Sequence, residues 1–129
     1  MAIGHLVAPA LQAAESLAKR GVSVEVVDPR TLSPLDKETI LASLAKTGRL
    51  MVADDSPRLA GAAAEIAAMA AEEGFEYLKA PIQRVTRLHV PVPFNLRLEN
   101  HVVPGRGRIE EAILKLFGLE RQAKEGVVS

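Results

Sequence analysis

A strand–loop–helix–strand unit in the first half of the chain most constrains its fold. The segment Val22–Val27 is rich in β-branched side chains, which predicts a buried strand. A loop with two prolines follows over 28–35, and Asp36 is well placed to cap a helix. That helix is expected to end at Gly48, before a second apolar strand over 49–53. A strand, helix and strand in this order favour a mainly parallel sheet covered by helices.

Helices and short apolar strands alternate along the rest of the chain as well. The spacing of apolar residues predicts helices over 7–20, 62–73 and 108–116. A third strand is expected over 82–86, and a turn at 54–57 precedes the second of these helices. Together these elements predict one domain with a three-layer α/β/α fold and a mainly parallel sheet.

Composition excludes several classes of protein. The chain has 129 residues, 16 basic and 16 acidic, so its zero net charge does not favour nucleic acid as a partner. It has no cysteine, which rules out a disulfide framework, a zinc ribbon and a thiol nucleophile. No apolar run is long enough to cross a membrane, and the start lacks the pattern of a signal peptide. We therefore expect a cytoplasmic protein that does not bind membranes.

Short motifs occur along the chain in a characteristic order and spacing. They are Val26–Val27–Asp28, Arg30–Thr31–Leu32, Pro34–Leu35–Asp36, Thr47–Gly48–Arg49–Leu50, Ala80–Pro81, Arg84–Val85–Thr86 and Pro91–Val92–Pro93–Phe94. In this order they resemble the C-terminal domain of the beta subunit of thiamine-diphosphate-dependent 2-oxo-acid dehydrogenases, the pyruvate, branched-chain and acetoin dehydrogenase family. The resemblance covers 1–119, and 120–129 is expected to be a disordered tail.

The resemblance implies a transketolase C-terminal domain-like fold that is shortened at its N-terminus. The family places two strands before the first helix, whereas 1–4 resembles only the end of one. A fragment, or a chain that completes its sheet with a partner, is therefore expected. Asp55–Ser56 and Leu78–Lys79–Ala80–Pro81 are similar to the acetoin dehydrogenase branch.

The resemblance also implies an assembly role without a chemical step in this chain. Such domains pair across a twofold axis and dock the subunit-binding domain of the dihydrolipoyl acyltransferase. The implied partners are the dehydrogenase alpha subunit, the N-terminal domain of the beta subunit, a second beta subunit and the acyltransferase, and a homo-oligomer is expected. The parent enzyme is expected to use thiamine diphosphate and magnesium. No catalytic, cofactor-binding or metal-binding residue is assigned here, so the isolated chain is predicted to be inactive.

Some polar residues nevertheless suggest chemistry. His5, His89 and His101 are far apart in sequence and lack metal-type spacing, so ordinary surface or loop roles are favoured. Asp54 and Asp55 follow a strand, where a carboxylate pair could bind a cation or share a proton. A turn in which these side chains cap nearby amides is the favoured interpretation.

Two further segments are candidates for recognition. The glycines and arginines of 104–108 precede a helix and could hold a phosphate or carboxylate, although a solvated turn is favoured. The apolar, proline-rich stretch 88–98 is expected to wrap the core, to form an interface, or both. The residues predicted to contact a protein partner are Lys79, Arg84, Val92, Phe94, Leu98, Arg106 and Arg108.

Two other functions stay open from the sequence. One is a stand-alone α/β domain that binds a small ligand at the strand ends near Asp28 and Asp54. The other is an inactive fragment that self-associates. The first predicts a stable monomer with saturable ligand binding, and the second predicts poorly cooperative unfolding.

Overall fold

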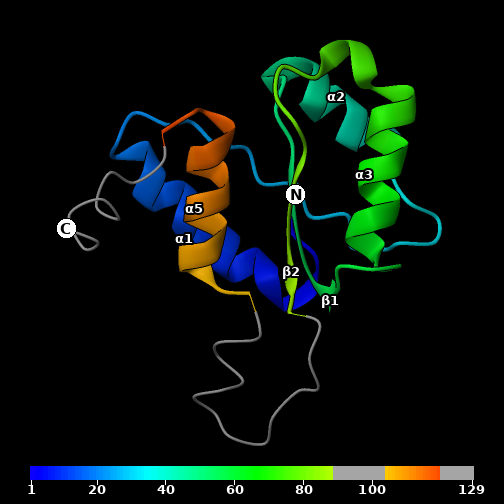
Figure 1. The fold of residues 1–129 in the computed structure, drawn as a ribbon, viewed down its shortest axis with the longest axis horizontal. Coiled ribbons are helices and arrows are strands. Elements are labelled where there is room, and N and C mark those ends of the chain that lie inside the picture. The colour runs from blue at the N-terminus through cyan, green and yellow to red at the C-terminus, as the bar shows by residue number, and fades with distance from the viewer. Residues whose placement is uncertain (89–103, 120–129) are drawn as a thin grey trace, which may run out of the picture.

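A parallel sheet lies between two pairs of helices in the computed structural model, which describes residues 1–88 and 104–119. One face is covered by α1 and α5 and the other by α2 and α3 (Figure 1). The three-layer α/β/α fold is therefore confirmed. No helix in the described ranges is long and apolar enough to cross a membrane. The elements are η1 (Gly4–Leu6), α1 (Val7–Ala18), α2 (Lys37–Thr47), β1 (Met51–Pro57), α3 (Ala62–Glu73), η2 (Phe75–Tyr77), β2 (Gln83–Arg87) and α5 (Arg106–Leu116).

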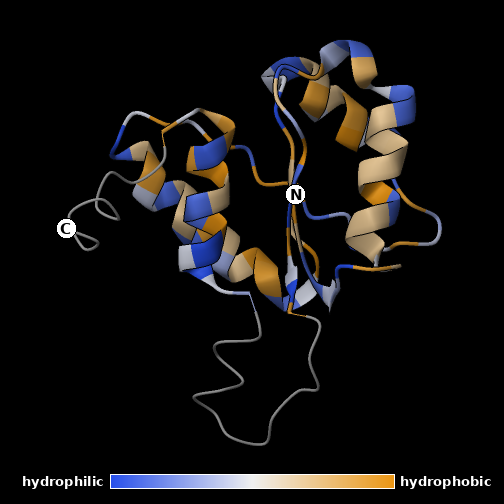
Figure 2. Cartoon of the chain, viewed as in Figure 1, coloured by the Kyte–Doolittle hydropathy of each residue, from blue (hydrophilic) through white to orange (hydrophobic). Residues whose placement is uncertain are grey.

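Alternate side chains of β1, and of Leu50 just before it, belong to two apolar clusters on opposite faces of the sheet. Met51 and Ala53 belong to the cluster packed under α1 and α5, whereas Leu50 and Val52 belong to the cluster packed under α2 and α3. This alternation is the period-two pattern of a strand that is buried on both faces. Figure 2 shows β1 changing from apolar to hydrophilic toward the edge at which it ends. Polar groups are thereby collected at one edge of the sheet.

The start and stop signals predicted for α2 are confirmed, whereas α1 ends at Ala18, two residues before its predicted end. The Asp36 carboxylate accepts hydrogen bonds from the main-chain amide and the hydroxyl of Thr39, at 3.2 and 2.7 Å. These two bonds also hold the pKa of Asp36 below its usual value. Gly48 ends α2 in the left-handed conformation, with φ of 75°. Only α5 departs from its predicted start, because it begins at Arg106 rather than Arg108.

The turn predicted at 54–57 is wrong, because β1 continues to Pro57. The pairing with β2 passes from Asp54 opposite Thr86 to Pro57 opposite Arg87, so the ladder is irregular between them. The Arg87 guanidinium binds both the main-chain oxygen and the carboxylate of Asp55, at 3.3 and 3.0 Å. These bonds hold the chain extended across the irregular step.

The strand predicted over Val22–Val27 is also wrong, because this segment forms no regular ladder with the other described residues. Val22, Val24 and Val26 still pack with the cluster under α1 and α5, as alternation predicts. A strand also needs main-chain partners, and Met1–Ile3 offers only a short one beside it. Residues 1–4 therefore contribute a single parallel bridge between Ala2 and Ala53, the strand end that was expected.

Candidate functional site

The carboxyl ends of β1 and β2 meet at one edge of the sheet, at the bottom of Figure 1. This edge is where open α/β folds usually place ligands. It carries Asp54 and Asp55 from β1, Thr86 and Arg87 from β2, and His5 from the short helix before α1. The residues are brought together by parallel pairing, although Asp55 and Arg87 are 32 positions apart.

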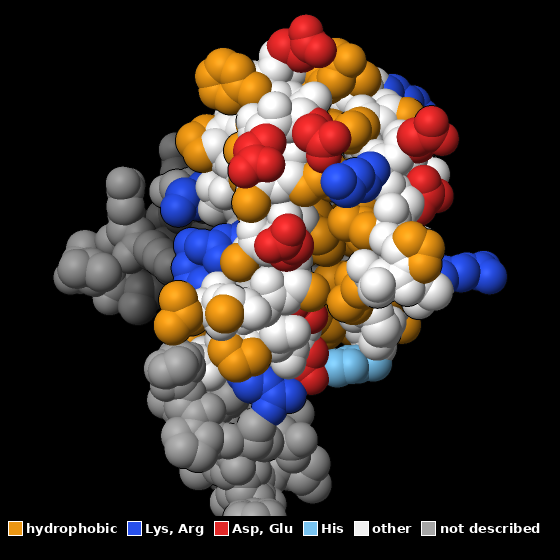
Figure 3. All heavy atoms as spheres, turned by 90° about the vertical axis from the view of Figure 1, so that its right-hand side faces the viewer, with side chains coloured by type: hydrophobic (Ala, Val, Ile, Leu, Met, Phe, Trp, Pro, Cys, Tyr) orange, Lys and Arg blue, Asp and Glu red, His pale blue; other side chains and the backbone are white. Residues whose placement is uncertain are grey.

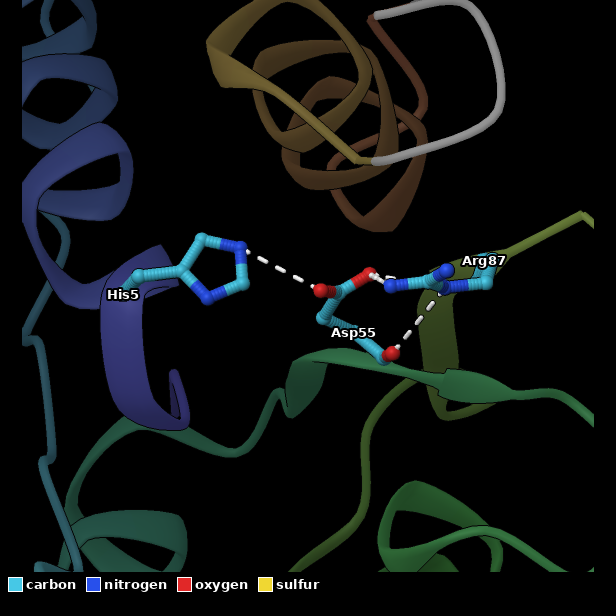
Figure 4. Close-up of polar contacts among 3 residues, drawn as sticks. All are labelled: His5, Asp55 and Arg87. Carbon is cyan, nitrogen blue, oxygen red and sulfur yellow. Dashed lines mark hydrogen bonds and ion pairs between the residues drawn. The ribbon is translucent and has the colours of Figure 1, made fainter. Parts of the chain in front are cut away.

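Asp55 lies between Arg87 and His5 (Figure 4). Its Oδ1 is 2.8 Å from Nη2 of Arg87, and its Oδ2 is 3.4 Å from Nε2 of His5. The side chains of Asp55 and Arg87 are each about one-fifth exposed, whereas the His5 side chain is 63% exposed. A carboxylate beside an imidazole can orient it for proton transfer, but charge-assisted bonds to an arginine also hold a strand end in place.

Asp54 is buried and has a separate task. Its Oδ2 accepts a hydrogen bond from the main-chain amide of Ala63 at 3.2 Å, at the start of α3. The loop before α3 can pass this close to the end of β1 because Gly61 has no side chain, and a Cβ there would lie 2.4 Å from the Pro57 oxygen. The two aspartates therefore do not act as one pair. The predicted capping of local amides within a turn is therefore wrong for Asp54, because this residue lies in β1 and caps the distant start of α3.

The described residues show no geometry that supports a small-ligand site between Asp28 and Asp54. Asp28 accepts a hydrogen bond from the Arg30 amide at 3.0 Å, a local turn contact, while Asp54 caps α3. Within the described ranges, no group of three or more histidine, aspartate or glutamate side chains could hold a metal ion.

Two predicted interface residues lie along β2 and the loop before it. The Nη1 of Arg84 donates to the Arg58 oxygen at 2.9 Å, and Arg58 returns a weaker bond of 3.4 Å to the Arg84 oxygen. Lys79 is exposed, and its amide donates to the Gly48 oxygen at 2.8 Å. Lys79 therefore lies at the amino edge of the sheet, whereas Arg84 connects β2 to the loop after β1 by hydrogen bonds.

The other two described interface residues lie in the first turn of α5. Arg106 pairs with Glu110 one helical turn later at 2.8 Å. Arg108 is half-buried, and its Nη1 has no hydrogen-bond partner among the described residues. Burial lowers the pKa of Arg108, and the charge of Glu111 acts in the opposite direction. The solvated turn favoured for 104–108 is wrong in part, because the helix already includes Arg106.

The predicted interface residues do not form one patch. Lys79 lies at the amino edge of the sheet, and the start of α5 lies at the carboxyl edge (Figure 1). The predicted residues Val92, Phe94 and Leu98 lie outside the described residues, as do His89, His101 and the tail 120–129.

Two features escaped the sequence reasoning. Arg87 could be matched to Asp55 only once the strand register was known. The sequence does carry a signal for an exposed aromatic pair at Phe75 and Tyr77. The chain has only three phenylalanines and one tyrosine, and these two directly follow the helix stop at Gly74. The Phe75 side chain is 76% exposed. A large exposed aromatic side chain is a common anchor of protein interfaces.

Comparison with known proteins gives consistent results. The family model of the transketolase C-terminal domain matches residues 1–109. The beta subunit of acetoin:2,6-dichlorophenolindophenol oxidoreductase from Bacillus subtilis is 45% identical over 117 residues, covering 91% of this chain and 34% of that protein. The mitochondrial pyruvate dehydrogenase E1 component subunit beta-2 of rice (Oryza sativa subsp. japonica) is 45% identical over 103 residues, covering 80% of this chain and 27% of that protein.

A solved structure agrees with the sequence relatives. A split-gene transketolase, described as an inactive beta4 tetramer, superposes with a TM-score of 0.75 at 26% identity, covering 93% of this chain and 39% of that chain. The chain spans about a third of the length of the curated relatives that it matches. From its order of elements, its parallel sheet and these matches, the chain belongs to the transketolase C-terminal domain family, with beta subunits of acetoin and pyruvate dehydrogenases among its relatives.

Proposed function

We propose that this chain is the assembly domain of the beta subunit of a 2-oxo-acid or acetoin dehydrogenase complex. The observation that carries the proposal is the 45% identity to such a beta subunit over 91% of the chain. The site geometry supports assembly rather than chemistry, because Asp54 caps α3 and Arg87 binds Asp55. Polar groups at the usual ligand edge are thus engaged within the fold.

The first proposed role is subunit pairing through the carboxyl edge. Leu88, exposed just after β2, and Arg106, exposed at the start of α5, flank this edge. Arg108 contributes a buried guanidinium nitrogen that lacks a partner among the described residues. A second copy could offer both apolar contact and acceptors here. The beta4 assembly described for the split-gene transketolase is compatible with pairing by such a domain.

The second proposed role is docking of a dihydrolipoyl acyltransferase through the amino edge. Phe75 and Tyr77 are exposed there beside Lys79, and acidic residues surround them on the end of α3 and in η2. Figure 3 shows acidic side chains gathered over the upper part of the α2 and α3 side, with apolar patches between them. This surface suits a partner that presents basic side chains around an apolar contact.

Cofactor chemistry is assigned to other parts of such an enzyme. Thiamine diphosphate with magnesium would supply the decarboxylation chemistry of the parent complex. We propose that this domain binds neither of them, as its resemblance to the C-terminal domain of such beta subunits implies. Its contribution is to hold the other parts of the complex in register.

Pairing can be tested by sedimentation velocity over a range of concentrations. The 129-residue chain is expected to form a reversible dimer, and Leu88→Glu is expected to keep it monomeric. Leu11→Glu is the matched control, because Leu11 is also an exposed leucine but lies on α1. A wild-type chain that stays monomeric at its highest soluble concentration, or a dimer that Leu88→Glu leaves intact, would refute pairing through this edge.

A further inference from the structure

The loop between β1 and α3, residues 58–61, presents an apolar side chain at the carboxyl edge of the sheet, next to the start of α3 (Figure 1). Leu59 in this loop is 78% exposed, more than any other large apolar side chain in 1–88 and 104–119. A single exposed leucine on a protein surface is common and needs no explanation by itself. Its surroundings therefore decide whether this one has a role.

The main chain around Leu59 is held in a fixed shape. Ala60, the next residue, has φ of 58°, a left-handed conformation that is unfavourable for a residue with a Cβ. On the other side of Leu59, Nη1 of Arg84 donates to the Arg58 oxygen at 2.9 Å. Strained non-glycine residues persist only where the surrounding structure fixes them, and they gather at binding sites. The loop is thus a rigid mount for the leucine.

Two arginine side chains cross between this loop and β2. While Arg84 donates to the Arg58 oxygen, Nη1 of Arg58 donates to the Arg84 oxygen at 3.4 Å. The Gln83 amide donates to the Leu50 oxygen, so the main-chain groups of residue 84 face away from β1. The Arg58 side chain therefore lies along the outer edge of β2. Both guanidinium groups are placed beside the loop that carries Leu59.

The charge of these two arginines is not neutralised within the described part of the chain. None of the ion pairs there includes Arg58 or Arg84. The nearby carboxylates are engaged elsewhere, since Asp54 caps α3 and Asp55 binds another arginine. Glu65, in the first turn of α3, pairs with neither. A guanidinium has five N–H donors, so each of the two keeps donors for further acceptors.

We infer that the surface formed by Arg58, Leu59 and Arg84 docks an acidic segment of a partner polypeptide, in which carboxylates flank an apolar side chain. Guanidinium groups bind carboxylates with paired, charge-assisted hydrogen bonds, and Leu59 supplies the apolar contact between them. Arginines around a buried apolar contact are a common arrangement at protein interfaces. A basic segment would be repelled, and a neutral one would leave both charges unpaired.

This inference goes beyond the two proposed assembly roles and uses other residues. Pairing was assigned to Leu88 and the start of α5, and acyltransferase docking to Phe75 at the opposite edge of the sheet. Binding of an acidic segment at the loop is therefore expected to be the same for the wild-type chain and for Leu88→Glu. A failure of pairing or of acyltransferase docking would leave the inference standing.

The test uses the 129-residue chain and a fluorescein-labelled peptide, Gly-Asp-Glu-Leu-Glu-Asp-Gly, followed by fluorescence anisotropy at low salt. We expect saturable binding that weakens several-fold when salt is raised, because exposed charges are screened. The peptide Gly-Asn-Gln-Leu-Gln-Asn-Gly, which has no side-chain charge, should bind at least tenfold more weakly. So should Gly-Asp-Glu-Gly-Glu-Asp-Gly, which lacks the apolar side chain.

Variants of the chain locate the binding. Arg58→Gln and Leu59→Gln are each expected to weaken binding of the acidic leucine peptide at least fivefold. Their matched controls are Arg20→Gln and Leu11→Gln, which change an exposed arginine and an exposed leucine of the α1 region and should leave binding unchanged. Circular dichroism confirms that all four variants fold.

Four results would overturn the inference. They are no saturable binding by the wild-type chain, equal binding of either altered peptide, undiminished binding by Arg58→Gln or by Leu59→Gln, and equal weakening by the control variants. Self-association that Leu59→Gln alone abolishes in sedimentation velocity, without peptide, would overturn it in favour of a second copy at this surface.

Discussion

The capping of α3 by Asp54 gives a quantitative prediction about stability. Gly61 precedes the helix and has no side chain to cap it, so the buried Asp54 carboxylate accepts from the Ala63 amide across nine positions. Replacing Asp54 with alanine leaves this buried donor without an acceptor. Replacing it with asparagine keeps an oxygen acceptor and removes the negative charge.

The magnitudes of the two effects differ. A lost helix cap costs about 1 kcal/mol, and leaving a buried donor unsatisfied costs about 1 to 3 kcal/mol. Because these terms overlap, Asp54→Ala is expected to lower the free energy of unfolding by about 2 kcal/mol. The charge near the helix N-terminus contributes about 0.3 to 1 kcal/mol, so Asp54→Asn is expected to cost less than half as much.

Urea unfolding followed by circular dichroism measures this difference. The slope of free energy against urea should stay constant while the midpoint falls. Asp28→Ala is the control, because Asp28 is exposed and makes a turn bond, so a change within about 0.5 kcal/mol is expected. If Asp54→Ala is as stable as the wild type, or if Asp54→Asn is equally destabilised, the capping argument is wrong.

Three further perturbations follow from the fold. Gly48→Ala should destabilise by about 1 to 2 kcal/mol in thermal unfolding, because an alanine would have to keep φ at 75°; an unchanged midpoint would contradict the left-handed cap. Ile66→Ala should cost about 2 to 5 kcal/mol in urea unfolding, because Ile66 is buried in the cluster between α3 and the sheet, and a loss below 1 kcal/mol would show that this cluster is poorly packed. Burial lowers the pKa of the Met1 amino group from 8.0 to about 6, so the unfolded chain binds more protons between these values and stability should rise by about 2 kcal/mol from pH 6 to pH 8. Acetylating the amino group should remove that rise, and a pH dependence that survives acetylation would assign it to another group.

Features that depend on neighbouring residues were predictable from the sequence. The cap at Asp36 involves Thr39, three positions later, and the left-handed stop at Gly48 depends on the conformational freedom of glycine alone. The span of α3 was also predicted correctly. The alternation of helices with short apolar strands along the chain correctly predicted the three layers, in which β1 is buried on both faces.

Features that depend on distant partners were not predictable. The segment Val22–Val27 has the composition of a strand, but composition cannot supply the neighbouring main chain that a ladder needs. The continuation of β1 beyond Asp54 depends on Arg87, whose partner Asp55 is 32 positions away. The exposed aromatic Phe75 lies in a short helix that no periodic pattern predicted. The residues predicted to form an interface are also divided between two edges of the sheet, which only the strand register revealed.

The central claim is that this domain assembles a dehydrogenase complex, and calorimetric titration with the subunit-binding domain of a dihydrolipoyl acyltransferase tests it most directly. Saturable binding is predicted for the wild-type chain. Phe75→Ala should weaken it at least tenfold, as expected for an aromatic anchor. Leu59→Ala, a change at an exposed residue just after β1, should leave it unchanged. Absence of binding by the folded wild-type chain would contradict the docking role, and undiminished binding by Phe75→Ala would contradict the surface proposed for it.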